Sequence, residues 1–325
     1  MPIPSSLQQG LRLPVVAAPM FLTSGPALVT ACSQAGIIGT FPALNQRSTE
    51  GFREWLREIT TALAASPNPA AYGVNLIVHK TNPRVAADLE VCAEFKVPLI
   101  ITSLGAAKDV VERVHAYGGV VFHDVTTAKH ARKAAEAGVD GLILVSAGAG
   151  GHAGAINPFA LLHEVRSFFQ GTILLAGALS TGSDVAAARM MGADFAYMGT
   201  RFIATQESYV SARYKEMLVE AGASDILYTP AISSIPANFL RQSIVEAGLD
   251  PEKLVAPPGI DLTHITEPYK KGPEEKAKAW RDVWSAGQGV GAIGDTPPAA
   301  ELIERLISEY RAARASFQRD DARFE

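Results

Sequence analysis

Short apolar runs recur along the chain and predict its strands. Each is rich in Val, Ile, Leu or Phe, ends in small or polar residues and shows little polar alternation, which is typical of parallel strands covered on both faces. There are eight: PVVAAP (14–19), GIIGTF (36–41), YGVNLIV (72–78), VPLIITS (97–103), GVVFHDV (119–125), GLILVSA (141–147), TILLAGA (172–178) and FAYMGT (195–200).

Helical patterns lie between these runs. In GFREWLREITTALAA, one apolar stripe at helical spacing is formed by Phe52, Trp55, Leu56, Ile59 and Leu63. The segments AKDVVERVHAYGG and TTAKHARKAAEAG each carry a small apolar face and stop at glycine, a favoured residue just beyond a helix end. SDVAAARMMGAD repeats the pattern before the eighth run. Strand and helix therefore alternate.

This alternation favours a (β/α)8 barrel, because eight units of about 30 residues are what that fold requires. An open, doubly wound sheet is the alternative, since six of the eight runs would also fit it. In either fold, binding residues gather at the carboxyl ends of the strands.

The alternation of strand and helix patterns ends after the eighth run. RYKEMLVEAG and RQSIVEAG resemble short helices, and VAPPGIDLTHITEPYKKGP is a loop rich in proline and glycine. We expect residues 1–204 and 287–325 to form the barrel and residues 205–286 to form a helical and loop insertion that covers its mouth. PPAAELIERLISEYRAARASF predicts an amphipathic C-terminal helix.

Composition and charge narrow the class of partner. The chain has 325 residues, 48% hydrophobic and 19% charged, with a net charge of -4, and no basic run favours nucleic acid or an anionic membrane. Cys32 and Cys92 are too few for a disulfide framework and indicate a reducing cytosol. The N-terminus lacks signal-peptide features, and no apolar run reaches the roughly 18 residues of a membrane span. We expect a cytoplasmic protein with a small-molecule partner.

Two glycine-rich strand ends predict a site for a phosphorylated ligand. After the sixth run, SAGAGGHAG offers backbone N–H groups that an anion can approach closely, and NPF begins a helix whose amino end favours negative charge. After the eighth run, MGTRF adds Gly199 and the Thr200 hydroxyl. The alternative is that these glycines only permit tight turns.

Three histidines reach the predicted mouth from separate strand ends: His79, His123 and His152. Three histidines can bind zinc or iron, but no HxH pair occurs and Asp124 is the only acid at a strand end, so we predict no metal. We predict that His152 acts as an acid, a base or a hydrogen-bond donor to substrate. His79 and His123 either contact substrate or cofactor or have structural roles.

Several motifs together resemble the FMN-dependent nitronate monooxygenase family, also known as 2-nitropropane dioxygenases. They are AAPM, YGVN, GAGGHAG, AGA, MGTRFIAT and the tail motif WSAGQGVGAI. The resemblance implies one FMN per chain, with its phosphate on the glycine-rich loops. It assigns the cofactor contacts to Ala18, Pro19, Met20, Asn75, Ser103, His123, Gly150, Gly151, Gly154, Gly177, Ala178, Gly199, Thr200 and Gln288.

The resemblance also implies the reaction. An anionic alkyl nitronate would reduce FMN, and reaction with O2 would yield a carbonyl compound and nitrite. His152 matches the catalytic histidine and would deprotonate a neutral nitroalkane or hold the charge of the nitronate. Many relatives have a QGGM-like segment in place of AAPM, and His79 and His123 are not general in the family, which indicates a distinct branch with its own substrate.

Two rival functions remain open. An NAD(P)H-dependent FMN reductase of enoyl or quinone substrates would share the AGGH loop, and the absence of GxGxxG does not exclude it. A non-catalytic binder of a phosphorylated ligand is the other. A homodimer is a further expectation, because the helices of the insertion and the C-terminus offer amphipathic surfaces.

Overall fold

The eight apolar runs form a closed parallel barrel in the computed structural model, which describes residues 3–105, 108–256 and 280–321. The order around the barrel is β1-β2-β3-β4-β5-β6-β8-β9, and β9 pairs with β1. The (β/α)8 prediction is confirmed and the open-sheet alternative is wrong. The strands are β1 (Val15–Ala17), β2 (Ile38–Pro42), β3 (Tyr72–Ile77), β4 (Leu99–Ser103), β5 (Val120–Val125), β6 (Gly141–Val145), β8 (Thr172–Ala176) and β9 (Phe195–Met198).

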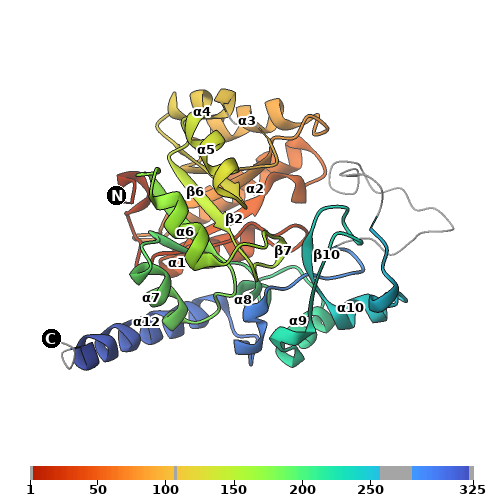
Figure 1. Ribbon diagram of the computed structural model, residues 1–325. Helices are drawn as coiled ribbons and strands as arrows, with labels where there is room; N and C mark the ends of the chain where they lie inside the picture. The colour runs from red at the N-terminus through yellow and green to blue at the C-terminus, as the bar shows by residue number, and fades with distance from the viewer. Residues whose placement is uncertain (1–2, 106–107, 257–279, 322–325) are drawn as a thin grey trace.

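The helices cover the outside of the barrel, as Figure 1 shows. Their bounds are α1 (Pro26–Ala35), α2 (Thr49–Ala64), α3 (Val85–Glu94), α4 (Lys108–His115), α5 (Ala128–Glu136), α6 (Pro158–Arg166), α7 (Gly182–Met190), α8 (Thr200–Ile203), α9 (Ala212–Glu220), α10 (Arg241–Glu246) and α12 (Ala299–Asp321). Short 3-10 turns are η1 (Ser5–Leu7), η2 (Ala43–Asn45), η3 (Ala223–Asp225), η4 (Pro251–Lys253) and η5 (Gln288–Ala292).

Two apolar layers hold the barrel together. Inside it, side chains such as Ile101 on β4 and Phe122 on β5 are fully buried, and these two residues face each other in the strand register. Outside it, the predicted stripe of α2 packs against the strands, with Phe52 and Leu56 buried completely. The strands therefore bury both faces, which explains their lack of polar alternation.

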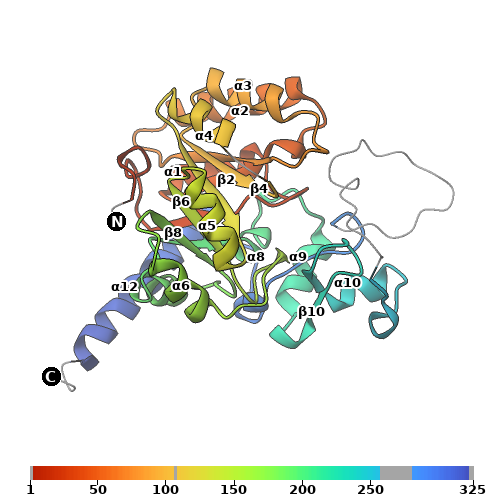
Figure 2. The same ribbon diagram turned by 45° about the horizontal axis from the view of Figure 1, so that its top comes forward.

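The insertion contributes two strands to a small antiparallel sheet that the sequence pattern did not predict. Its strands are β10 (Ile226–Thr229), β11 (Ala237–Leu240) and β7 (Gly151–His152), and β7 belongs to the loop after β6. The expectation of helices and loops alone was therefore wrong, because strands of two to four residues carry too little periodicity to be recognised. Figure 2 shows α9, α10 and β10 together on one side of the barrel.

The C-terminal helix α12 packs alongside α7 and α1 (Figure 1). Most of the predicted proline-rich loop and His264 lie outside the described residues. In the part of the chain that the structure describes, no helix is both long and apolar enough to cross a membrane.

Candidate functional site

A cavity of about 940 Å³ opens at the carboxyl ends of the barrel strands. Its volume lies at the upper end of the range for ligand pockets, so that a cofactor and a small substrate fit together. Among the residues that line it are these predicted ones: Ala18, Pro19, Met20, Asn75, Ser103, His123, Gly150, Gly151, His152, Gly154, Gly177, Ala178, Gly199 and Thr200. The lining does not include His79 or Gln288.

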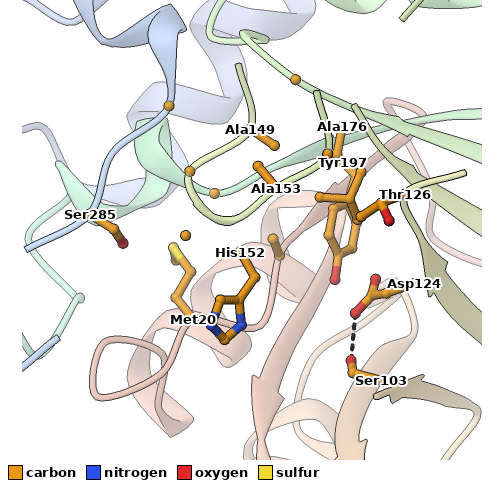
Figure 3. Close-up of a pocket in the computed structure, with 18 of the residues that line it drawn as sticks. Met20, Ser103, Asp124, Thr126, Ala149, His152, Ala153, Ala176, Tyr197 and Ser285 are labelled. Carbon is orange, nitrogen blue, oxygen red and sulfur yellow. Dashed lines mark hydrogen bonds between the residues drawn. The ribbon is translucent and has the colours of Figure 1, made fainter. Parts of the chain in front are cut away.

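The floor of this cavity is a chain of polar side chains on neighbouring strands. Asn75 on β3 donates from Nδ2 to Ser103 Oγ at 2.8 Å, and Ser103 on β4 donates to Asp124 Oδ2 on β5 at 2.5 Å. Tyr197 on β9 extends its ring towards Asp124 (Figure 3). In the register of β3 and β4, Asn75 pairs with Ile101, so Asn75 and Ser103 are diagonal neighbours two positions apart.

Asp124 and Tyr197 are titratable groups in an apolar surrounding. Burial raises the pKa of Asp124 to about 6, against the opposing effect of the Ser103 hydrogen bond. The second carboxyl oxygen, Oδ1, is buried and has no hydrogen-bond partner among the described residues. Burial, and then the charge of Asp124, raise the pKa of Tyr197 well above its usual value. The sequence analysis missed Tyr197, although its spacing of two from the inward Phe195 could have indicated it.

His152 is held by strand pairing rather than by a free loop. It follows Gly151, whose φ of 68° suits glycine, and β7 pairs with β11 in the register Ala237↔His152. Asn238 on β11 donates from Nδ2 to the Ala149 carbonyl at 2.7 Å and so fixes the same loop. The imidazole lies edge-on to Trp280, with ring centroids 5.0 Å apart, and points into the cavity beside Met20 (Figure 3).

The other two histidines occupy different surroundings. The His123 ring is 2.7 Å from Thr102 Oγ1, and burial together with the neighbouring His130 lowers its pKa to about 4, so that it is neutral at pH 7. His79 Nδ1 lies 2.9 Å from Thr81 Oγ1. Within the described ranges, no group of three or more His, Cys, Asp or Glu side chains is arranged to hold a metal ion.

The loops after β8 and β9 form the glycine-rich end of the cavity. Gly177 has a φ of 138°, and a Cβ there would lie 2.4 Å from Ser146 Oγ, so the turn requires glycine. A Cβ on Gly199 would meet Met20 Sδ at 3.6 Å, an ordinary van der Waals contact, so no clash requires glycine at that position. Ser180 also lines the cavity, and its buried Oγ has no partner among the described residues.

These features fit the phosphate end of FMN. An unpaired hydroxyl and backbone without side chains are what a phosphate group requires from its site. The barrel loop is tied to the tail motif here, since Thr200 Oγ1 accepts from Gly287 N at 2.9 Å and the Gln288 side chain lies against Gly148. The α6 helix begins after Asn157 as expected, but the lining stops at Ile156, so its amino end does not face the cavity.

Comparison with known proteins identifies the family. The family model described as nitronate monooxygenase matches residues 68–309. Nitronate monooxygenase from Paraburkholderia phytofirmans is 26% identical over 93% of each chain. A (3aS,4S,5R,7aS)-5-hydroxy-7a-methyl-1-oxo-octahydro-1H-indene-4-carboxyl-CoA dehydrogenase from Rhodococcus jostii is 25% identical over 92% of this chain and 93% of its own.

The solved structures agree on the architecture. A variant of FabK from Thermotoga maritima superimposes with a TM-score of 0.76 and 25% identity over 96% of both chains. The matched family model covers most of the barrel, the insertion and the tail motif, which together form the cavity. The chain therefore belongs to the nitronate monooxygenase family, whose members are FMN-dependent oxidoreductases that oxidise alkyl nitronates.

Proposed function

We propose that the barrel mouth is where this chain oxidises an alkyl nitronate, with His152 as the residue that handles the proton and the negative charge. The observation that carries this proposal is that His152 projects into the same cavity as the polar floor and the glycine-rich end. FMN, when bound, takes electrons from the nitronate and passes them to O2, which yields a carbonyl compound and nitrite.

Two groups of residues would hold the cofactor. Gly177, Ser180, Gly199 and Thr200 would receive the phosphate, because they combine bare backbone with hydroxyl groups. Met20, Asn75 and Ser103 would contact the ring from the barrel side, where they line the cavity.

The surroundings of His152 suit acid or base chemistry. Strand pairing holds its backbone, and Trp280 packs against its ring in a T-shaped contact and restricts the approach of water on that side. A fixed imidazole at the reacting carbon would remove a proton from a neutral nitroalkane, and its protonated form would pair with the resulting anion.

Replacement of His152 by asparagine tests this role. We expect His152→Asn to lower kcat/KM for neutral nitroalkanes by about 10²- to 10⁴-fold, the usual contribution of a positioned general base. Turnover of preformed nitronate should fall much less, because that substrate is already deprotonated. Steady-state oxygen consumption with 2-nitropropane and with propyl-2-nitronate measures both.

The control is flavin content, which His152→Asn should leave at one FMN per chain. Equal losses with nitroalkane and nitronate, at full flavin content, would contradict the base role.

A reductase is the second candidate, favoured by the similarity to a carboxyl-CoA dehydrogenase and to FabK. Anaerobic stopped-flow absorbance separates the two functions. Bleaching of the flavin by propyl-2-nitronate, without response to NADH or NADPH, supports nitronate oxidation. Bleaching by a nicotinamide alone would make His152 a hydrogen-bond donor to a carbonyl oxygen instead.

We further propose that the enzyme works in the cytosol on small molecules. Cys32 and Cys92 are both buried and free, and burial raises the pKa of each thiol, so neither is poised for disulfide chemistry. The homodimer stays a prediction, to be tested by sedimentation or light scattering of the holoenzyme.

A further inference from the structure

The cavity continues beyond the barrel mouth along one face of α5. Thr127, His130, Ala134 and Ala137 recur at intervals of three or four residues, and all four line the cavity that contains His152. At 1.5 Å per residue, this face runs about 15 Å from Thr127 to Ala137. Ile156, between β7 and α6, lines the same cavity.

This extension, which we call the α5 groove, has an apolar body, and the basic side chains His130 and Lys133 lie at its rim. Ala134 is buried, and Ala137 and Ile156 are partly buried apolar side chains that also line the cavity. His130 and Lys133 are exposed and line the cavity as well. Such a lining suits an aliphatic chain that carries a negative charge.

Lys133 differs from its basic neighbour on the same helix. The Arg132 guanidinium lies 3.8 Å from the centroid of the Phe168 ring. The Lys133 ammonium, by contrast, has no hydrogen bond or ion pair with any residue that the structure describes. A lysine that borders a cavity and has no protein carboxylate is available to an anionic ligand.

The α5 groove lies away from the cofactor's phosphate end. The glycine-rich end follows β8 and β9, whereas α5 follows β5, which is separated from β9 by β6 and β8 in the barrel. The phosphate of the cofactor and the rim of the groove are thus different anion positions. An anion at the rim of the groove would therefore be bound apart from the proposed phosphate position of the cofactor.

We propose that the α5 groove binds an aliphatic tail on the substrate's reacting carbon, and that Lys133 pairs with an anionic group at the far end of that tail. This inference rests on the proposed function, since it names the class of nitronate that the site accepts. The reacting atoms and the overall reaction remain the same, and the tail contributes binding energy only.

The first experiment compares nitronates of different length with the holoenzyme. We expect kcat/KM to rise from the nitronate of 1-nitropropane to that of 1-nitrooctane, by up to about four-fold for each methylene that the groove buries. The nitronate of 8-nitrooctanoate should be better still, because its carboxylate reaches Lys133. Equal kcat/KM for the short and the long nitronates would overturn the proposal.

Substitutions at the rim and in the wall then locate the effect. Lys133→Ala should lower kcat/KM for 8-nitrooctanoate by about two- to five-fold, the range of an exposed ion pair, and leave 1-nitrooctane unchanged. Lys129→Ala is the matched control, since Lys129 is an exposed lysine of α5 that does not line the cavity. Ala137→Trp, at a position of helical backbone, should impair both long substrates and leave 1-nitropropane unchanged.

A binding measurement separates this proposal from the proposed function. Calorimetry with octanoate should show binding to the holoenzyme that Lys133→Ala weakens and Ala137→Trp abolishes, while Lys129→Ala has no effect. If no nitronate is turned over but this pattern holds, the proposed function fails and the α5 groove stands. If nitronates are turned over but Lys133→Ala and Lys129→Ala bind octanoate equally, the groove proposal fails alone.

Discussion

Asp124 is a carboxyl group whose pKa is changed by its burial in the barrel. Its pKa is raised to about 6, so the folded protein binds this proton more tightly than the unfolded chain, where the pKa is near 3.9. Below pH 4 both states are protonated. As the pH rises from about 4 through 6, the free energy of unfolding decreases. Above pH 6 the full decrease, on the order of 3 kcal/mol, is present.

Asp124→Asn removes this titration. In urea unfolding of flavin-free protein, we expect the variant to be more stable than wild type by up to about 3 kcal/mol at pH 8 and by much less at pH 4.5. Ser103→Ala is the control with the opposite sign. It deletes the hydrogen bond that stabilises the carboxylate, so the pKa of Asp124 should rise further. The decrease in the free energy of unfolding should then extend to higher pH. A stability difference between Asp124→Asn and wild type that is independent of pH would contradict the argument.

Most residues at the strand ends could be predicted from the sequence. A parallel strand that ends in Asn75, Ser103 or Gly177 delivers that residue to the mouth, whatever the details of packing. Lys133 and Trp280 could not be found in this way. They reach the cavity from a helix face and from the insertion, and only the tertiary arrangement shows which helix face borders a cavity.

At the scale of elements, the pairing of β7 with β11 controls the position of His152. Asn238 is 2% exposed and supports this pairing through its bond to the Ala149 carbonyl. Removal of that buried bond costs about 1–3 kcal/mol of local stability. We expect Asn238→Ala to lower kcat for nitroalkanes at least ten-fold while flavin content is retained, as measured by turnover and absorbance.

Gln242→Ala provides the comparison in the adjacent helix α10, because Gln242 is exposed and its side chain donates a hydrogen bond to Glu246 of the same helix. Similar activities of the Asn238 and Gln242 variants would show that the pairing does not position His152. The sequence analysis placed His152 correctly after the sixth strand but missed β7, since a two-residue strand depends on its partner and has no pattern of its own.

At the scale of the whole molecule, α12 completes the wall of the barrel between α1 and α7. Leu302, Ile303 and Leu306 are buried there against residues of β1 and α1. The carboxylate of Glu309 accepts from Gly182 N at 2.7 Å, and Glu304 pairs with Arg12 near the other end of the chain. The C-terminal segment thus belongs to the folded core.

Leu302→Ala should destabilise the protein by about 2–5 kcal/mol, because it leaves a cavity in this packed layer. Phe317→Ala in the same helix is the control, since Phe317 is 47% exposed and its loss should cost under about 0.5 kcal/mol. Chemical unfolding followed by circular dichroism measures both. Equal costs for the two substitutions would show that α12 is attached only loosely.

The pairing of β7 with β11 also bears on how such enzymes diversify. The strand pairing between the barrel loop and the insertion at His152 is made by main-chain atoms, which are the same for every amino acid. An insertion recombined from a related gene can therefore change the side chains over the substrate and still keep the histidine in place, provided that the register at Ala237 and the Asn238 amide that holds the Ala149 carbonyl are conserved. New substrate ranges then arise by exchange of one segment, and the machinery for electron transfer is inherited unchanged.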